Sequence, residues 1–412
     1  MEKEKFLKRM FQEYYKNQLN NLDITSKIEQ REWGFAFWDI LSFQRHKNFK
    51  NFKELKQFLL KNGPKHVYAS AAYYEIPEAL KMNQKFWIGC DFIADIDADH
   101  LPSKCKWEHD SFKCKNCGFS GKGPPPKICT CGNTTFDQKI WVCDRCLELA
   151  KRETLKIFEE FLIPDLNINP NEIKIKFSGH RGYHLQIQSE EFRNLGQDAR
   201  RELVDYLTGT GIDFKVLGLY EGRKKIVFGP NLNQKGWRGR ITNYVFKFIE
   251  QLTYENMKLF KTLSTPLKKK IVENKKLILE NLTKIPSNWN IVPGISLEHW
   301  EELVHLAINK YSAKLDIPVS IDVHRLIRLD NSLHGKTGLK ADPISINKLN
   351  DYDPLKDAIV FKGQIELIMK KCPEFRFGDT LYGPYSEGEK EELSLAAGIY
   401  ALCKNMAALP KN

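Results

Sequence analysis

The chain has 412 residues, of which 42% are hydrophobic, 12% are aromatic and 28% are charged, and its formal net charge is +12. This length allows two or three domains, and this apolar content is typical of a globular protein rather than of extended disorder. The apolar runs, such as Leu395 to Cys403, are too short to span a bilayer, and the first ten residues are charged. We therefore expect no membrane span, no secretory signal and a soluble, cytoplasmic protein. The positive charge favours a polyanionic partner such as nucleic acid, although a lysine-rich solvated surface is the alternative.

The N-terminal part contains two runs of apolar residues at helical spacing, which predict helices over 5–20 and 51–62, followed by a strand from His66 to Ala69. Between the two helices, Arg31, Arg45 and His46 lie in a segment rich in aromatic residues. These three side chains could face a phosphate group or form ordinary salt bridges, and the sequence alone leaves the two about equal.

An acidic strand is predicted within Asp91 to Asp99, because apolar and acidic residues alternate there with the period of a strand. Asp95 and Asp97 therefore point to the same face, roughly 7 Å apart along the backbone. Two carboxylates this close repel each other, and a hard cation such as Mg²⁺ or Mn²⁺ would relieve the repulsion and bridge to a substrate phosphate. The simpler alternative is an acidic strand end that faces solvent.

Seven of the ten cysteines lie between Cys105 and Cys146, and in a cytosolic chain such crowding indicates metal binding rather than disulfides. One set has the two-knuckle spacing of a zinc ribbon: Cys114, Cys117, Cys129 and Cys131. The other set combines a third knuckle, at the start of a predicted helix, with two upstream ligands: Cys143, Cys146, Cys105 and His109. His100 is a less favoured substitute for His109, which could also be a surface histidine. Eight ligands predict two tetrahedral zinc sites.

A core-packing helix is predicted from Leu147 and ends before Pro164, and a strand over 173–177 then turns tightly into a second strand. The turn holds Ser178, Arg181 and His184, and its two glycines let the backbone approach a ligand closely. A hydroxyl, a planar cation and an imidazole around one point are the donors that a triphosphate needs. A plain hairpin with a surface arginine is the alternative.

From about 190 to 310 the sequence becomes helical, with helices predicted over 190–208, 241–263, 267–284 and 297–312. Between the first two lies the segment 222–240, in which basic residues are interleaved with Trp and Phe. Such a segment suits the backbone and the exposed bases of a nucleic acid, although an exposed basic loop without a partner is nearly as good an interpretation. We interpret the whole region as an inserted subdomain.

The C-terminal part returns to strand-like sequence from Leu315 to Val323, which contains Asp316 as a third possible metal carboxylate. A second phosphate-type cluster follows, formed by Arg328, His334 and Lys336. Short strand-like pieces are predicted over 341–384, and a terminal helix is predicted over 387–409.

Five groups of residues, in this order, resemble the motifs of the catalytic small subunit of archaeo-eukaryotic DNA primase in its archaeal form. The resemblance runs over most of the chain, and the motifs are specific as a set although each alone is weak. They are Arg31-Glu32-x-x-Phe35 with Arg45-His46, Ser70-Ala71-Ala72-Tyr73-Tyr74, Asp95-Ile96-Asp97-Ala98-Asp99-His100-Leu101-Pro102, Ser178-Gly179-x-Arg181-Gly182-x-His184, and Arg325-Leu326-Ile327-Arg328-x-x-x-Ser332-Leu333-His334-Gly335-Lys336-Thr337-Gly338.

The resemblance implies an α/β (α+β) catalytic core with mixed and antiparallel sheets, a zinc-binding insertion and an inserted helical subdomain. We expect the core to comprise 1–104, 147–190 and 313–412, with the zinc-binding segment at 105–146 and the helical subdomain at 191–312. The resemblance also implies that catalytic Mg²⁺ or Mn²⁺ is bound by Asp95, Asp97 and Asp316. It implies that the nucleotide phosphates are contacted by Ser178, Arg181, His184, Arg328 and His334.

The implied function is template-directed synthesis of RNA primers for DNA replication, by two-metal nucleotidyl transfer in a chain that also holds structural zinc. The expected partners are a large regulatory primase subunit in a heterodimer, a single-stranded DNA template, an RNA or DNA primer and nucleoside triphosphates. The expected location is the nucleoid. One rival is a repair-type or translesion polymerase on the same fold. The other is a zinc-ribbon nucleic-acid-binding protein without catalysis, which would have no use for paired carboxylates in a basic groove.

Two features depart from the family pattern. Members usually carry a single compact zinc knuckle here, so the ribbon from Cys114 to Cys131 is extra and its role is open between a contact to the large subunit and one to DNA. The usual proline before Ser332-Leu333-His334-Gly335 is replaced by Asp330-Asn331, which we expect to alter the turn without removing its donors.

Overall fold

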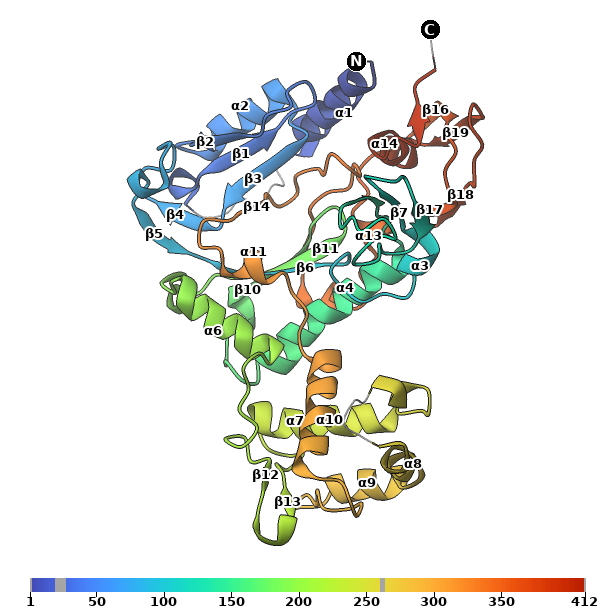
Figure 1. Ribbon diagram of the computed structural model, residues 1–412. Coiled ribbons are helices and arrows are strands. Elements are labelled where there is room, and N and C mark those ends of the chain that lie inside the picture. Colours follow the sequence, from blue (N-terminus) through green and yellow to red (C-terminus); the bar gives the residue numbers. More distant parts are fainter. Residues whose placement is uncertain (1, 19–26, 260–263, 411–412) are drawn as a thin grey trace. The chain divides into compact units, whose positions relative to one another are not determined.

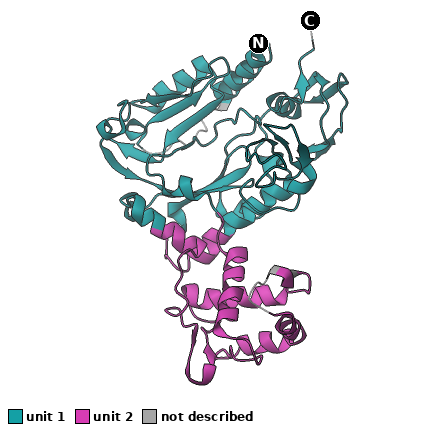
Figure 2. Ribbon diagram, viewed as in Figure 1, with its two compact units in different colours: residues 1–155, 169–201, 315–412 teal, residues 156–168, 202–314 magenta. Residues whose placement is uncertain are grey.

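The computed structural model describes residues 2–18, 27–259 and 264–410, and these pack as two compact units (Figures 1 and 2). Unit 1 is drawn from residues 1–155, 169–201 and 315–412, and unit 2 from 156–168 and 202–314. Within the described ranges, every helix is too short or too polar to cross a membrane. Helices alternate with antiparallel sheets in unit 1, which confirms the predicted fold class.

The first sheet of unit 1 has the strand order β14-β3-β1-β2, and all of its pairs are antiparallel. Its strands are β1 (Trp33–Ala36), β2 (Gln44–Lys47), β3 (His66–Ser70) and β14 (Leu326–Arg328). Two helices share a core with this sheet, α1 (Glu2–Gln18) and α2 (Phe52–Asn62). The core includes Phe11, Tyr15, Trp33, Phe35, Leu55 and Leu59.

The two helices and the strand predicted for this region are confirmed within the described residues. The helix over 51–62 and the strand at 66–69 are confirmed, the helix with Asn51 as its N-cap and Gly63 in the left-handed region at its end. The helix over 5–20 is confirmed up to Gln18, and its last two residues lie outside the described residues.

The second sheet of unit 1 has the order β15-β10-β11-β6 and is also antiparallel throughout (Figure 1). Its strands are β6 (Phe92–Asp97), β10 (Ile173–Phe177), β11 (Gly182–Ile187) and β15 (Pro343–Ile344). In its register, His184 lies opposite Asp95 and Gly182 opposite Asp97. A Cβ atom at Gly182 would lie 2.2 Å from the carbonyl oxygen of Ile96, so only glycine fits beside the acidic strand.

A helix follows the cysteine-rich segment. It begins as α4 (Asp144–Lys156) and continues as a π-helix over Ile157–Leu162, ending before Pro164 as predicted. The segment itself has a three-stranded sheet, in the order β8-β7-β9, and a short helix. These elements are α3 (Lys106–His109), β7 (Ser111–Cys114), β8 (Ser120–Lys122) and β9 (Phe136–Lys139).

Several smaller elements complete unit 1. One hairpin pairs β4 (Ala72–Tyr74) with β5 (Trp87–Cys90). Two short helices, α12 (Ile346–Leu349) and α13 (Pro354–Asp357), precede a second hairpin of β17 (Phe375–Phe377) and β18 (Thr380–Tyr382).

The predicted terminal helix over 387–409 is wrong at both ends. Its first part is the strand β19 (Lys390–Ser394), which pairs with β16 (Gln364–Met369), and its last part is the short strand β20 (Ala407–Ala408). Only α14 (Leu395–Cys403) is helical. Leu393 lies opposite Ile365 and is buried, so pairing with β16 overrides the helical propensity of the glutamates before it.

Unit 2 is mainly helical and has a core of tryptophans and aliphatic residues. Its helices are α7 (Gly236–Glu250), α8 (Thr265–Glu273), α9 (Lys275–Leu282) and α10 (Leu297–Tyr311), and its one described hairpin is β12 (Tyr220–Glu221) with β13 (Val227–Phe228). Trp289 and Trp300 are both buried and meet edge to face with their centroids 5.0 Å apart.

Three of the predicted helix ranges in this region need correction. The range 190–208 is two helices, α5 (Glu190–Arg193) and α6 (Gln197–Thr208), and 267–284 is interrupted at Asn274. The helix predicted at 241–263 begins earlier and ends at Glu250, and residues 260–263 lie outside the described residues. The helix predicted at 297–312 is confirmed by α10.

A candidate active site and two candidate metal centres

A cleft of about 200 Å³ in unit 1 brings together residues from both sheets. Seven of the eight predicted catalytic and phosphate-binding residues line it: Asp95, Asp97, Ser178, Arg181, His184, Arg328 and His334. Asp316, the eighth, lies beside it, because its backbone N–H donates to the carbonyl oxygen of Asp95 over 2.8 Å. Segments more than 200 residues apart in the sequence therefore meet at one place.

The acidic side of the cleft is formed by Asp95 and Asp97 on β6 and by Asp316. Burial raises the pKa of Asp95 to about 8, and the negative charges of Asp97 and Asp316 act in the same direction. Burial also raises the pKa of Asp97, against the effect of the nearby Arg181. Oδ1 of Asp95 is buried and accepts no hydrogen bond from the described residues. The three carboxylates thus form an electrostatically unfavourable group that a cation would stabilise.

Asp316 does not lie on a strand, so the strand-like interpretation of Leu315 to Val323 is wrong. It is the N-cap of the five-residue helix α11 (Ile317–Ile321), and its Oδ1 accepts a hydrogen bond from the backbone N–H of Val319 over 3.1 Å. An aspartate followed by Pro318 in the first turn is typical of a helix start, and this local chemistry overrides the apolar alternation. Its Oδ2 lies 3.4 Å from Nδ1 of His100.

Arg181 lies in the turn between β10 and β11 and is paired with two carboxylates. Its Nε donates to Asp97 over 2.8 Å and its Nη1 lies 2.7 Å from Asp99. Asp99 continues the alternation of Asp95 and Asp97, but it is not among the candidate site residues predicted from the sequence. In this conformation Arg181 borders the carboxylates as well as the phosphate-type donors.

Arg328, on β14, also lines the cleft and is held by two neighbours on β3. Its Nη2 donates to the hydroxyl of Tyr68 over 2.8 Å, its Nη1 lies 3.0 Å from Nδ1 of His66, and its guanidinium lies over the Tyr68 ring. Burial and the charge of Arg328 lower the pKa of His66, so the ring is neutral and can accept from Arg328. His66 and Tyr68 could not be predicted as neighbours of Arg328, because the β14–β3 register that brings them together is not visible in the sequence.

Three histidines adjoin one another beside Arg328. The His180 and His334 rings are stacked, with centroids 4.7 Å apart and planes at 14°, and the His66 ring meets His334 at 68°. Burial and the surrounding cations lower the pKa of His180 and of His334 well below the ordinary value. Since Nδ1 of His334 accepts the backbone N–H of Lys336, the neutral ring carries its proton on Nε2 and can donate from there.

His184 and Ser178 also line the cleft. Burial lowers the pKa of His184 to about 3, so the ring is neutral, and its Nε2 lies 3.4 Å from Oδ1 of Asp95. The Ser178 hydroxyl accepts the backbone N–H of Gly182 over 3.2 Å. Its own proton is therefore free to be donated elsewhere.

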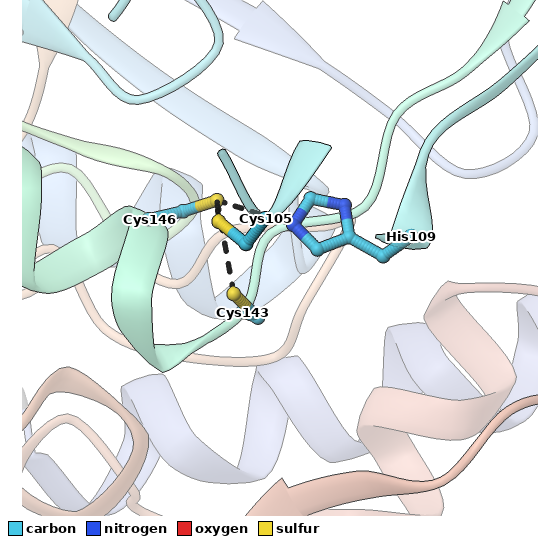
Figure 3. A group of neighbouring side chains, drawn as sticks. All are labelled: Cys105, His109, Cys143 and Cys146. Carbon is cyan, nitrogen blue, oxygen red and sulfur yellow. Dashed lines mark hydrogen bonds between the residues drawn. The ribbon is translucent and has the colours of Figure 1, made fainter. Parts of the chain in front are cut away.

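The first candidate metal centre is formed by Cys105, His109, Cys143 and Cys146 (Figure 3). Cys105 directly precedes α3 and His109 ends it, whereas Cys143 directly precedes α4 and Cys146 lies in its first turn. One ligand atom from each residue lies within 4.8 Å of the others. Nδ1 of His109 lies 2.8 Å from Oδ1 of Asp110, which fixes the ring so that Nε2 faces the three sulfurs.

The second candidate centre is formed by Cys114, Cys117, Cys129 and Cys131, whose sulfurs also lie within 4.8 Å of one another. Gly118 and Gly132 follow the knuckles with φ of 74° and 81°, which is the left-handed region that such turns require. Asn133 donates to the Cys114 sulfur over 3.4 Å and lowers the pKa of that thiol to about 6. Four thiols at this spacing are compatible with Zn²⁺, and both groups match the sets proposed from the sequence.

The structure resolves the choice that the sequence left open for Arg31 and Arg45. Arg31 is buried and forms an ion pair with Asp91 at 3.1 Å, and Arg45 binds the buried Glu32 through two nitrogens at 3.0 and 3.2 Å. Nδ1 of His46 lies 3.4 Å from the same Glu32 carboxylate. These side chains form salt bridges rather than facing the cleft.

Asp330, the first of the two residues that replace the usual proline, is anchored to β10. It is buried and forms ion pairs with Lys176 at 2.7 Å and Lys174 at 2.6 Å, both on β10. Burial alone would raise its pKa, but the two lysines hold it below the ordinary value. Asn331, which follows, adopts a φ of 57°, a conformation that asparagine tolerates better than most residues. With this turn, Arg328 and His334 both line the cleft.

The fold and the site define an α/β protein in which carboxylates and phosphate-type donors face one cleft. A family model described as the DNA primase small subunit matches residues 136–346. The DNA primase small subunit of Methanothrix thermoacetophila is 33% identical, with 98% of each chain covered. That of Archaeoglobus fulgidus is 31% identical, again with 98% of each chain covered, and that of Methanococcoides burtonii is 30% identical, covering 98% of this chain and 97% of its own.

The chain therefore belongs to the DNA primase small subunit family. The resemblance seen in the five motifs is confirmed over nearly the whole length of the protein.

Proposed function

We propose that this protein is the catalytic subunit of a DNA primase and makes short RNA primers on single-stranded DNA by nucleotidyl transfer. The observation that supports this most strongly is the cleft of unit 1, in which Asp95 and Asp97 face Arg328 and His334. A nucleoside triphosphate needs both groups of residues. Its phosphates require cationic and neutral donors, and the reacting centre requires carboxylates that hold a cation.

We propose that Asp95, Asp97 and Asp316 hold two catalytic cations, Mg²⁺ or Mn²⁺. Carboxylate oxygens are the donors that these ions prefer, and the raised pKa values and the unpartnered Oδ1 of Asp95 fit a site that is incomplete without one. When bound, two such ions would activate a primer 3′-hydroxyl and stabilise the charge that develops on the α-phosphate and the pyrophosphate.

The other residues of the cleft act on the triphosphate itself. Arg328 is already oriented by His66 and Tyr68, so its planar cation is ordered before the nucleotide arrives. The Nε2–H of His334 and the hydroxyl of Ser178 are neutral donors that fix the position of the phosphates. Arg181 uses Nε and Nη1 for Asp97 and Asp99, and its Nη2 is free of protein partners among the described residues, so it can reach a phosphate while it supports the carboxylates.

We further propose that both cysteine groups bind structural zinc, since all four positions of each are filled by protein ligands. We also propose that the chain acts in a heterodimer with a large primase subunit. Its relatives are named small subunits, which implies an assembly with a second chain.

The test is a primer-synthesis assay on single-stranded DNA without any primer, with and without the large subunit, comparing ribonucleotides with deoxyribonucleotides. We expect short ribonucleotide products from the bare template. A protein that extends primers or fills gaps but never starts a chain would contradict the proposal and support the repair-type polymerase. A protein that binds DNA but synthesises nothing would support the other rival, a zinc-ribbon nucleic-acid-binding protein without catalysis.

A further inference from the structure

The hairpin of β12 and β13 in unit 2 carries an aromatic pair that the fold does not use. Tyr220 and Phe228 lie opposite each other in the register, and their rings stack with centroids 5.3 Å apart and planes at 19°. Their side chains are 42% and 46% exposed, whereas the adjacent Leu219 and Val227 are buried and anchor the hairpin. The Phe228 ring lies directly across Gly222, where a Cβ atom would come within 2.7 Å of it. The aromatic pair is therefore held in place at the surface.

The same hairpin presents a group of cations without acidic partners. Arg223, Lys224 and Lys225 form its turn, Lys215 lies shortly before it, and all four are exposed. Among the described residues, none of these four side chains is within ion-pair distance of a carboxylate. Each positive charge is thus available to a ligand, unlike Arg240 further along, which lies 2.8 Å from Asp165.

The turn itself is built at a conformational cost. Lys224 and Lys225 both adopt the left-handed region, with φ of 59° and 58°. Hairpin turns of this geometry favour Asn-Gly or Gly-Gly, because a side chain strains the backbone there. Lysines at these two positions make the turn less stable than glycines would, and they place two positive charges at its tip. Backbone strain of this kind is concentrated at functional sites.

We propose that this hairpin is a binding site for single-stranded nucleic acid, with unpaired bases stacking on Tyr220 and Phe228 and phosphates binding Arg223, Lys224 and Lys225. Under the proposed function, on which this identification of the ligand rests, that strand is the DNA template. Aromatic faces flanked by cations are how proteins hold single strands without reading their sequence. A duplex cannot offer a base to these rings, because its bases are already stacked on one another.

The segment 222–240 was interpreted from the sequence as a whole, and the structure divides it. Trp237 is buried and donates from its ring nitrogen to the carbonyl oxygen of Tyr206. Trp237 and Arg240 therefore belong to the core of unit 2, whereas Tyr220, Phe228 and the cationic turn at 223–225 are exposed.

The test is fluorescence anisotropy of the full chain with a labelled mixed-sequence single strand and with the matching duplex, over a series of salt concentrations. Tyr220→Ala/Phe228→Ala should weaken single-strand binding by about tenfold or more at an unchanged salt slope, because stacking releases no counterions. Arg223→Gln/Lys224→Gln/Lys225→Gln should make the negative slope of log K against log salt shallower by about 2. Each phosphate contact on a single strand contributes roughly 0.7 to the size of that slope.

Two control variants make the outcome specific. Tyr220→Phe/Phe228→Tyr keeps both rings and should bind like the unaltered protein. Lys268→Gln/Lys269→Gln/Lys270→Gln removes the same charge from α8 of the same unit and should leave the affinity almost unchanged. None of these variants alters the buried Leu219 or Val227, which anchor the hairpin, so thermal unfolding should not shift.

The proposal is overturned if the alanine pair binds the single strand normally, or if the α8 variant loses as much affinity as the hairpin variant. It is also overturned if the hairpin variants keep DNA binding but lose the large primase subunit, which would make the hairpin a protein-binding site. Since the readout is binding, loss of primer synthesis with intact hairpin-dependent binding would count against the proposed catalytic function alone.

Discussion

Asp95 lies in surroundings that disfavour its negative charge. Its carboxyl group is buried beside Asp97 and Asp316, and its pKa is raised to about 8. In the unfolded chain the same group ionises near 3.8. The folded protein therefore binds an extra proton between these values, and the contribution of Asp95 to stability is greatest below about pH 4 and is lost as the pH rises through about 8.

From this we predict that Asp95→Asn stabilises the protein in the absence of added Mg²⁺ or Mn²⁺. Asparagine has nearly the same volume and cannot ionise, so it removes the cost of burying the carboxylate. The free energy of unfolding should increase by about 2 kcal/mol at pH 8 and by little near pH 4. Thermal unfolding of both proteins across this range measures the effect. A gain that is largest at acidic pH, or a loss at pH 8, would contradict the assigned electrostatics.

At this scale, the sequence predicted the side chains that belong to local patterns. Asp95 and Asp97 were found from strand alternation, and Ser178, Arg181 and His184 from one tight turn. His66, Tyr68 and His180 were missed, because what orders Arg328 and His334 is the contact of segments far apart in the sequence. A single histidine in a strand carries no signal of such a contact.

At the scale of elements, Asp330 joins the end of β14 to β10. Its two lysine partners keep its pKa below the ordinary value, so the stability it contributes is present above about pH 4 and is lost as the pH falls through its folded pKa.

We predict that Asp330→Asn lowers the free energy of unfolding by about 3–5 kcal/mol at neutral pH, because Lys176 is left buried without its counter-charge. Urea unfolding at two pH values measures the effect, and the difference from the unaltered protein should shrink in acid. A difference that is constant with pH would mean that the ion pairs contribute little and that the loss is one of packing.

The cysteine-rich segment gives a second prediction at this scale, namely two zinc ions per chain. Cys143→Ser should remove one of them and Cys117→Ser the other, since the two centres have no ligand residue in common. Because structural zinc is coupled to folding, each variant should also lower the melting temperature. Elemental analysis of the purified protein checks the count, and a value of one or none in the unaltered chain would refute the two-centre assignment.

Helices were predicted correctly where one helix face is buried over several turns, as in α2 and α10. Prediction failed where helix capping or strand pairing overrides the apolar periodicity of the sequence. A helix was predicted over residues 387–409, but Lys390–Ser394 pairs with β16 and is therefore a strand. Asp316 lies in an apolar alternation, but an aspartate followed by Pro318 starts a helix.

At the scale of the whole molecule, the two units carry different chemistry. Unit 1 contains the cleft and both candidate metal centres, and unit 2 contains the basic and aromatic hairpin. The net charge of +12 indicated a polyanionic partner, but it could not say which surface binds it, because net charge is a property of the whole chain. What fixed the family was the order of several weak motifs over the full length of the chain.

The central claim is that Asp95, Asp97 and Asp316 hold the cations that nucleotidyl transfer requires. The rate of primer synthesis by Asp97→Asn tests it most directly. With the large subunit present, we predict a fall of roughly 10³-fold or more, while template binding stays the same or tightens slightly because a negative charge is lost. Asp322→Asn, at the opposite end of α11 from Asp316, should remain close to the unaltered rate. A folded Asp97→Asn protein that makes primers at the unaltered rate would contradict the account.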